Sequence, residues 1–196
     1  MGEWGGILLE KLVKCSITVR IFMTDQQSVG VGDMFLLDGK INQVFKMGKE
    51  TNLDGEVVPF VFFKPCFEGH RTNGVECSIP LANFGLLRQR GLVTKAEAKE
   101  LLDSMSEKVA QKTPLEVEEA EMLAARNSFA DKVGLVRRLW KEKGQKEKGF
   151  AYSKGVILNR ALEDVCQEVS MVLGIDYEKA IKKVENKLAR AEKKKE

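Results

Sequence analysis

The sequence predicts an α+β protein in which a small antiparallel β-barrel precedes an all-helical domain of about five helices. Two observations predict this division. Short apolar runs separated by turn residues fill the chain from residue 29 to about 87, which is typical of a small barrel or a curled sheet. From residue 94 the apolar residues recur at helical spacing instead. We therefore expect an N-terminal extension at 1–28, a barrel at 29–90 and a helical domain at 91–196.

Composition narrows the possible functions. The 196 residues carry a formal net charge of only +3, so nucleic-acid binding requires a local basic patch. No apolar run reaches the roughly 18 residues that a membrane span needs. The four cysteines are scattered without a C-x-x-C pair, which argues against a metal centre. They are Cys15, Cys66, Cys77 and Cys166. Free, buried thiols in a reducing cytoplasm are the expectation.

The first 28 residues have two interpretations that we weigh equally. Met23 precedes a polar stretch that reads as a natural start, so residues 1–22 are either a misplaced start or a short amphipathic appendage over 8–22. Lys11 and Lys14 follow the apolar run at 7–9 and no small-residue cleavage site is present, which makes a signal peptide a poor match.

The stretch 29–47 predicts the first hairpin of the barrel. Asp38-Gly39 separates the apolar strand 34–37 from the next strand, and this dipeptide favours a two-residue hairpin turn because glycine accepts positive φ. The apolar residues after the turn do not alternate perfectly. We expect a β-bulge near Asn42-Gln43 for this reason.

Two further strands follow the hairpin. Residues 57–63 are rich in β-branched and aromatic side chains. Pro59 cannot donate to a ladder, which places it at a sheet edge or near a strand end. Residues 75–79 form a last short strand that Pro80 ends, and 81–87 form a connector that returns apolar side chains to the barrel.

The helical half is defined by its start and stop signals. Thr94 and Glu97 form a capping box, and Thr113 and Glu116 a second one with Pro114 at the first helical position. Ser128 is predicted to cap the third helix, with Val133, Val136, Leu139 and Trp140 inward.

The last two helices have simpler signals. Ser153 is predicted to start the fourth helix and Gly174 to end it. Asp176 opens the final helix. No internal repeat is present in the chain.

No catalytic constellation is evident, and the sequence does not predict an enzyme or a cofactor. The single histidine, His70, has no identifiable nucleophile or orienting acid beside it. It is predicted to be a surface loop residue. Gly30-Val31-Gly32 precedes a strand instead of following one, so it is not a dinucleotide fingerprint.

A dense group of basic residues is the strongest chemical signal in the helical half. Such residues either contact phosphates or form a charged, solvated face, with Trp140 in the core. The group comprises Lys132, Arg137, Arg138, Lys141, Lys143, Lys154 and Arg160.

With these elements in order, the chain resembles the CarD/CdnL family of bacterial transcription regulators. Val31-Gly32-Asp33 followed by Gly39-Lys40-Ile41 is similar to the start of the family's β-module. Residues 79–88, IPLANFGLLR, are similar to its close. Residues 136–140, VRRLW, and 158–162, LNRAL, are similar to the family's helical pattern. The resemblance covers about 29–192.

The resemblance implies a Tudor- or SH3-like module that binds the β subunit of RNA polymerase, and a helical domain that contacts promoter DNA and stabilises the initiation complex. Lys46, Lys49 and Ser78 stand at or beside the polymerase-binding positions. The DNA-binding candidates are Arg137, Arg138, Lys141, Lys143, Lys154 and Arg160. A monomer without metal or cofactor is expected.

Two alternatives stay open. Many family members carry a tryptophan wedge where this chain has Thr113-Pro114-Leu115, followed by Glu116, Glu118 and Glu119. This acidic helix start favours an adaptor that binds polymerase without DNA. The second alternative is an RNA-binding barrel with Phe60, Phe62 and Phe63 as stacking platforms, which requires at least two of these rings to be exposed.

Overall fold

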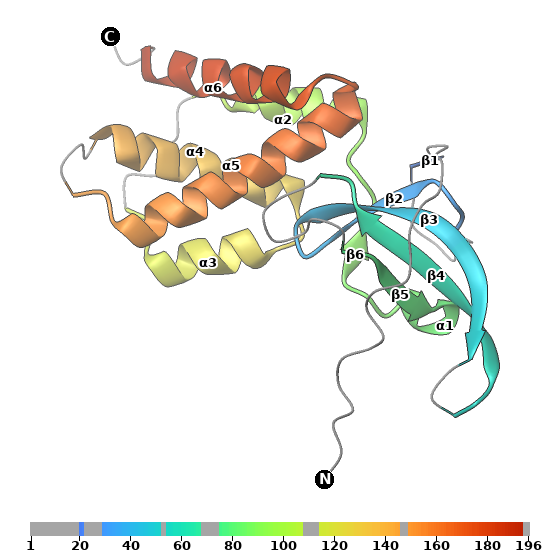
Figure 1. The fold of residues 1–196 in the computed structure, drawn as a ribbon. Coiled ribbons are helices and arrows are strands. Elements are labelled where there is room, and N and C mark those ends of the chain that lie inside the picture. Colours follow the sequence, from blue (N-terminus) through green and yellow to red (C-terminus); the bar gives the residue numbers. More distant parts are fainter. Residues whose placement is uncertain are drawn as a thin grey trace. The chain divides into compact units, whose positions relative to one another are not determined.

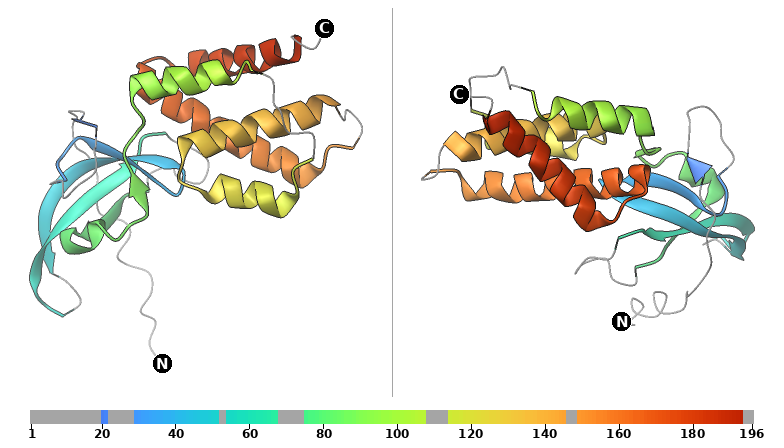
Figure 2. Two further views of the ribbon diagram at one scale, coloured as in Figure 1. Left: turned by 180° about the vertical axis from the view of Figure 1, so that it is seen from behind. Right: turned by 90° about the horizontal axis from the view of Figure 1, so that it is seen from above.

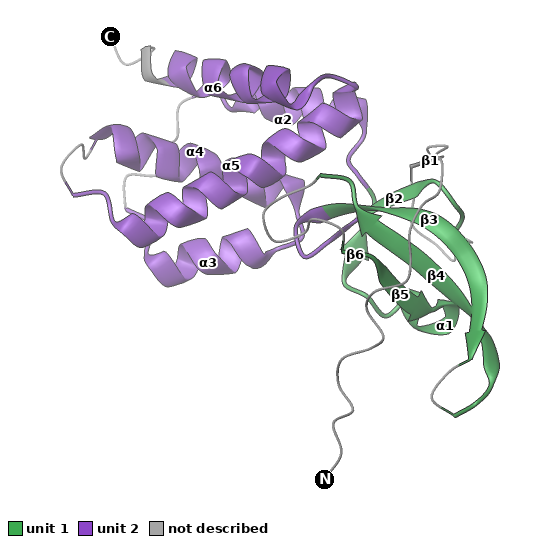
Figure 3. Ribbon diagram, in the orientation of Figure 1, with its two compact units in different colours: residues 1–35, 41–91 green, residues 36–40, 92–196 purple. Residues whose placement is uncertain are grey.

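The computed structural model describes residues 20–21, 29–51, 54–67, 75–107, 114–145 and 149–193. The chain divides into two compact units (Figure 3). Unit 1 contains residues 1–35 and 41–91, and unit 2 contains residues 36–40 and 92–196. Strands dominate unit 1 and helices dominate unit 2, so the architecture is α+β, as the sequence predicted. Residues 36–40, which the sequence placed inside the barrel, group with the helices.

Six described strands form one curled sheet (Figure 1). They are β1 (Arg20–Ile21), β2 (Asp33–Leu37), β3 (Lys40–Thr51), β4 (Val57–Pro65), β5 (Cys77–Pro80) and β6 (Gln89–Arg90). The order is β1-β2-β3-β4-β5, with β6 also paired to β2. β3–β4 and β4–β5 are antiparallel, whereas β1 runs parallel to β2. These strands make an open half-barrel.

The first hairpin turns as its sequence predicts. Asp38 and Gly39 have φ values of 50° and 79°, the positive pair that a two-residue type I′ turn requires. A bulge is present, but it lies between Val44 and Lys46, while Asn42 and Gln43 pair regularly. The bulge was therefore predicted in kind and placed about two residues too early.

Three phenylalanine rings form the aromatic centre of unit 1. Phe35 on β2 meets Phe63 on β4 and Phe84 on α1 (Leu81–Phe84) edge-to-face, with ring centroids 5.2 and 5.1 Å apart. All three are buried. Such pairs contribute about 0.5–1.5 kcal/mol each beyond their area. The connector 81–87 thus returns Phe84 to the core as predicted, but Leu86 is 80% exposed and does not take part.

In addition to the turn 36–40, the described residues of unit 2 form five helices. They are α2 (Lys95–Ser104), α3 (Val117–Ala125), α4 (Phe129–Gln145), α5 (Tyr152–Leu173) and α6 (Tyr177–Lys193). α4 and α5 run side by side, and each contacts all the other helices of the unit (Figures 1 and 2). Val133, Val136 and Leu139 are at most 1% exposed in this core, and Trp140 packs against it, as predicted.

Most helix boundaries follow the predicted signals. Thr94 and Glu97 form the reciprocal capping box, and Ser128 accepts from the Asp131 amide. Gly174 ends α5 in the left-handed region with φ 64°, where glycine is favoured. α6 starts directly after Asp176, whose carbonyl accepts from Ala180.

Two predicted helix starts are displaced. α3 begins at Val117 with Glu116 as its N-cap residue, so Pro114 precedes the helix and does not occupy its first position. Thr113 lies outside the described residues. α5 begins at Tyr152, one residue before the predicted Ser153.

Candidate interaction surfaces

The polymerase-binding candidates Lys46 and Ser78 lie on one line across the sheet of unit 1. Lys46 on β3 and Ser78 on β5 both pair directly with Phe62 on β4. Residues that pair directly across an antiparallel ladder share a face, and both candidates are exposed. We call this line the Lys46–Phe62–Ser78 row.

The ring of Phe62 forms the apolar base of this row. The Nζ atom of Lys46 lies 4.6 Å from the ring centroid, and Phe62 is only 1% exposed. A cation at this distance is attracted by the ring's electron-rich face, and the aliphatic stem of the lysine covers apolar surface. The ammonium group is thereby held above the sheet at a defined place.

Further aromatic and basic side chains, which were not grouped from the sequence, lie on the same face. Phe45 and Phe60 both lie 6.4 Å from Phe62 between ring centroids. Lys64 places its Nζ 5.5 Å from the centroid of Phe45. The spacing Phe60, Phe62, Lys64 at every second residue was a signal for one shared face. The bulge that brings in Phe45 could not be located from sequence.

Lys49 lies apart from the other two candidates. It pairs with Pro59 and stands three residues after Lys46, so strand alternation places it on the opposite face. Lys49 is exposed like Lys46. The structure therefore brings together only two of the three predicted polymerase-binding residues.

β5 lies at the end of the strand order, and within the described residues it is bonded only to β4. β5 pairs with Phe60 to Phe63 of β4. Pro59 lies just outside this paired segment and near the start of β4, in agreement with the prediction of a position near a strand end. An end strand presents backbone donors and acceptors that a partner strand can use. This edge begins beside Ser78.

The aromatic residues of β4 do not form a stacking platform for RNA. Phe62 and Phe63 are 1% and 5% exposed, and as consecutive strand residues they point to opposite faces. Only Phe60 is partly accessible. The exposure that the RNA-binding alternative requires is absent at these residues.

Lys154, predicted to bind DNA, is instead a buried member of an ion pair. Its Nζ donates to Oε1 of Glu142 over 2.8 Å, and each residue is 8% exposed. The second carboxylate oxygen accepts from the Leu115 amide at 3.4 Å. A buried lysine needs a partner of opposite charge, and α4 supplies it. The side chain of Lys154 therefore points into the protein, and its contact with DNA stays a prediction.

Arg137 and Arg138 are largely covered and pair with acidic residues. Arg137 bonds the Glu107 carbonyl at 3.3 Å and approaches its carboxylate at 4.0 Å. Arg138 bonds Glu119 at 3.0 Å. Their side chains are 19% and 18% exposed. Both positive charges are therefore offset within unit 2.

The remaining predicted DNA contacts differ in accessibility. Lys143 and Arg160 are exposed, and Lys141 is half-buried. Lys143 lies near the end of α4 and Arg160 in α5. For these three residues, contact with DNA stays a prediction, and two of them, Lys143 and Arg160, are exposed.

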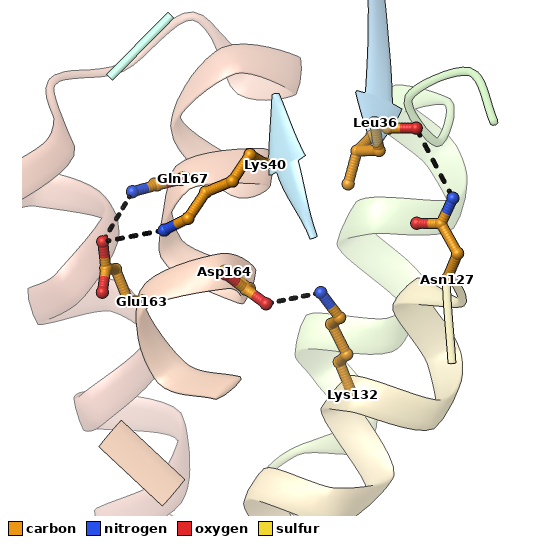
Figure 4. Close-up of polar contacts among 7 residues, drawn as sticks. All are labelled: Leu36, Lys40, Asn127, Lys132, Glu163, Asp164 and Gln167. Atoms are coloured by element: carbon orange, nitrogen blue, oxygen red, sulfur yellow. Dashed lines mark hydrogen bonds and ion pairs between the residues drawn. The ribbon is translucent and has the colours of Figure 1, made fainter. Parts of the chain in front are cut away.

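Lys132, grouped with the basic residues in the sequence, belongs to a second buried ion pair. Its Nζ lies 2.5 Å from Oδ2 of Asp164, and the two residues are 2% and 6% exposed (Figure 4). Burial raises the pKa of the Asp164 carboxyl, and the Lys132 charge acts in the opposite direction. The pair joins α4 to α5 inside unit 2.

The turn 36–40 packs on this ion pair. A Cβ atom on Gly39 would lie 2.8 Å from both Lys132 Nζ and Asp164 Oδ2. On either side of the turn, the Leu36 carbonyl accepts from Asn127 at 3.5 Å and Lys40 pairs with Glu163 at 3.6 Å (Figure 4). Glycine is thus required at residue 39 both by its φ and by the close approach.

The described cysteines are free thiols. Burial raises the pKa of Cys66 to about 11 and that of Cys166 to about 12, and it also raises the pKa of Cys77. A thiol of such pKa is protonated near neutrality and is a poor nucleophile. Cys15 and His70 lie outside the described residues. Among the described residues no cluster of metal-binding side chains occurs.

Within the described part of the chain, none of the helices combines the length and the apolarity that a membrane crossing demands. No protein-family model matches the sequence, and no curated protein matches it either.

Proposed function

We propose that the protein is a transcription regulator of the CarD/CdnL type. It binds the β subunit of RNA polymerase through the sheet of unit 1 and contacts promoter DNA through unit 2, which stabilises the initiation complex. We further propose that the sheet is an SH3- or Tudor-like module. The order of strand-rich and helical units supports this proposal, together with the family-like residues at 31–41, 79–88 and 136–140.

The observation that carries the proposal is the Lys46–Phe62–Ser78 row beside the end strand β5. It combines an exposed cation, an apolar base and a strand edge on adjacent strands. A partner strand that pairs with β5 gains affinity from backbone hydrogen bonds and specificity from neighbouring side chains. Lys46 would face an acidic group of the partner and favour the correct orientation.

Contact with DNA is the second half of the proposed function. The basic residues Lys143 and Arg160 are exposed on α4 and α5, and Lys141 is half-buried on α4. Cations of this kind contact phosphates without reading the base sequence. Their role would be to hold the duplex rather than to select a promoter.

A specific observation favours the adaptor alternative, in which the protein binds polymerase without DNA. Arg137, Arg138 and Lys154 each pair with a glutamate. Half of the six predicted DNA contacts therefore have their charge offset within unit 2. A salt titration of promoter binding separates the two functions, since phosphate contacts make affinity fall steeply with salt.

A matched pair of charge reversals in the whole chain tests polymerase binding. Lys46→Glu and Lys49→Glu change the same charge at exposed residues on opposite faces of β3. We expect Lys46→Glu to weaken binding to purified core RNA polymerase at least about tenfold, because like charges then meet at the interface. Lys49→Glu should bind like the wild type.

Lys46→Gln, which removes the charge without reversing it, should give an intermediate affinity. Thermal unfolding of all three variants checks that the sheet is intact. Equal binding by the wild type and Lys46→Glu, or failure of the wild type to bind polymerase at all, would contradict the proposal.

A further inference from the structure

α6 carries a stripe of four basic residues and one asparagine, which were not among the residues predicted from the sequence to bind a partner. The stripe consists of Lys179, Lys182, Lys183, Asn186 and Arg190, all exposed. Relative to the first, the others follow at 3, 4, 7 and 11 residues, the spacing of one helix face. We call these residues the α6 stripe. α6 is labelled and drawn in red in Figure 1.

The opposite face of α6 is fixed in the core of unit 2. Ala180, Val184 and Leu188 are 0%, 0% and 2% exposed. Because these residues hold the helix against its neighbours, the stripe must point to solvent and cannot rotate inward. The exposed acidic residues Glu178 and Glu185 lie four residues before and three residues after Lys182, so they border the stripe on one side.

Ion pairs inside the protein offset only part of this charge. Lys179 forms an ion pair with Asp176 at 2.7 Å. Lys183 attracts the carboxylate of Asp103 electrostatically, and Asp103 also forms an ion pair with Lys187. In the described residues no ion pair involves Lys182 or Arg190. This is the reverse of α4, where Arg137 and Arg138 are covered and paired.

We propose that the α6 stripe is a docking surface for the phosphate backbone of duplex DNA. From Lys179 to Arg190 the stripe extends about 16 Å at the rise of an α-helix. One DNA strand carries a charge roughly every 3.4 Å along the duplex axis, so a stripe of this length faces about five phosphates. The absence of an accessible apolar side chain within the stripe fits contact with phosphates rather than with bases or with an apolar protein surface.

This inference rests on the DNA role proposed above and assigns most of the contacts with DNA to the α6 stripe. Two double variants of the whole chain test whether the stripe binds DNA. The stripe variant is Lys182→Ala/Arg190→Ala, and the comparison variant on α4 and α5 is Lys143→Ala/Arg160→Ala. Each removes two exposed positive charges from helices, so both lower the formal net charge from +3 to +1. The probe is a promoter-length duplex of arbitrary sequence, titrated between low and moderate salt.

We expect the stripe variant to reduce the slope of log affinity against log salt by about 2, because each lost phosphate contact removes roughly 0.9. The comparison variant should change the slope by less than half as much. The same loss should occur with a second duplex of unrelated sequence.

Three outcomes overturn the inference. An unchanged slope for the stripe variant, with a reduced slope for the comparison variant, would leave the proposed function intact and place the contact on α4 and α5. Reduced binding to polymerase with unchanged binding to DNA would assign the stripe to a protein partner. No DNA binding by the wild type at low salt would overturn the inference together with the DNA half of the proposed function, while the Lys46→Glu experiment still tests the polymerase half.

Discussion

Gly39 lies so close to Lys132 that a Cβ atom at residue 39 would come within 2.8 Å of the lysine Nζ. The lysine is held there by its buried ion pair with Asp164. The turn of a β-hairpin and the centre of a helical unit are therefore in direct contact, and each restricts the residues that the other can accept.

The first prediction concerns Gly39→Ala. Gly39 and Gly174 both have positive φ, at 79° and 64°, but nothing lies within 4 Å of a Cβ atom at Gly174. Gly174→Ala should cost about 1–2 kcal/mol of unfolding free energy through its backbone alone. Gly39→Ala should cost roughly 2 kcal/mol more, because the methyl group must displace the ion pair.

Urea unfolding followed by the helical circular dichroism signal measures both variants. Both residues belong to unit 2, so one signal serves for the comparison. Equal losses at the two glycines would show that the turn does not press on the ion pair.

The second prediction concerns the buried pair itself. Lys132→Met leaves the Asp164 carboxylate buried without its cation and should cost about 3–5 kcal/mol near neutral pH. The double variant Lys132→Met/Asp164→Leu removes both charges and should recover most of this loss. A double variant no more stable than Lys132→Met in urea unfolding would contradict the prediction.

The same pair gives a signed pH dependence. Burial raises the pKa of Asp164 above its usual value, so the native state binds a proton more readily than the unfolded chain. The contribution of the Asp164 carboxyl to stability is then fully present below its pKa in the unfolded chain. This contribution declines as pH rises through its pKa in the native state. In Lys132→Met the opposing effect of the lysine is gone and the decline becomes larger. Urea unfolding at pH 4 to 7 should therefore show that the cost of Lys132→Met grows as pH rises.

The third prediction separates buried from exposed lysines on the helices. Lys154→Met removes the lysine cation from the buried Glu142 and should destabilise the protein by about 3–5 kcal/mol. Lys143→Met, at an exposed residue near the end of α4, should change stability by less than about 0.5 kcal/mol. If Lys154→Met keeps wild-type stability and weakens DNA binding instead, Lys154 is a DNA contact after all.

The fourth prediction concerns thiol reactivity at pH 8. The pKa of Cys66 is raised from 9.0 to about 11, which lowers its thiolate fraction roughly a hundredfold, while the higher basicity of the thiolate restores part of the rate. Cys66 should react with iodoacetamide roughly tenfold more slowly than an exposed cysteine, and Cys166, with a pKa of about 12, more slowly still. Mass spectrometry of the separate peptides gives each rate, and 6 M guanidinium should abolish the difference. Fast native labelling of Cys166 would show that α5 opens readily.

The sequence predicted well the features that depend on neighbouring residues. The capping box of Thr94, the turn at Asp38-Gly39 and the end of α5 at Gly174 each follow from a few adjacent side chains and their φ preferences. The prediction of free thiols was confirmed for Cys66, Cys77 and Cys166, but only Cys166 is buried.

Features that depend on distant partners could not be predicted in the same way. Lys132 and Lys154 look like surface lysines until the fold brings Asp164 and Glu142 to them, 32 and 12 residues away. The meeting of Lys46 and Ser78 across Phe62 depends on strand register, which the bulge shifts by one residue. The α6 stripe differs, since its helical spacing was present in the sequence and could have been found there.

The assignment of residues 36–40 to unit 2 has a consequence for how this protein can be recombined. The chain passes between the units after residues 35, 40 and 91, so the helical unit is not one contiguous piece of sequence. A cut at residue 91 would give a helical fragment that lacks the turn over Lys132 and Asp164, with that buried ion pair opened to water. Exchange of the helical unit between related proteins must therefore carry the hairpin turn with it, and substitutions at Gly39, Lys132 and Asp164 are expected to be inherited as a set.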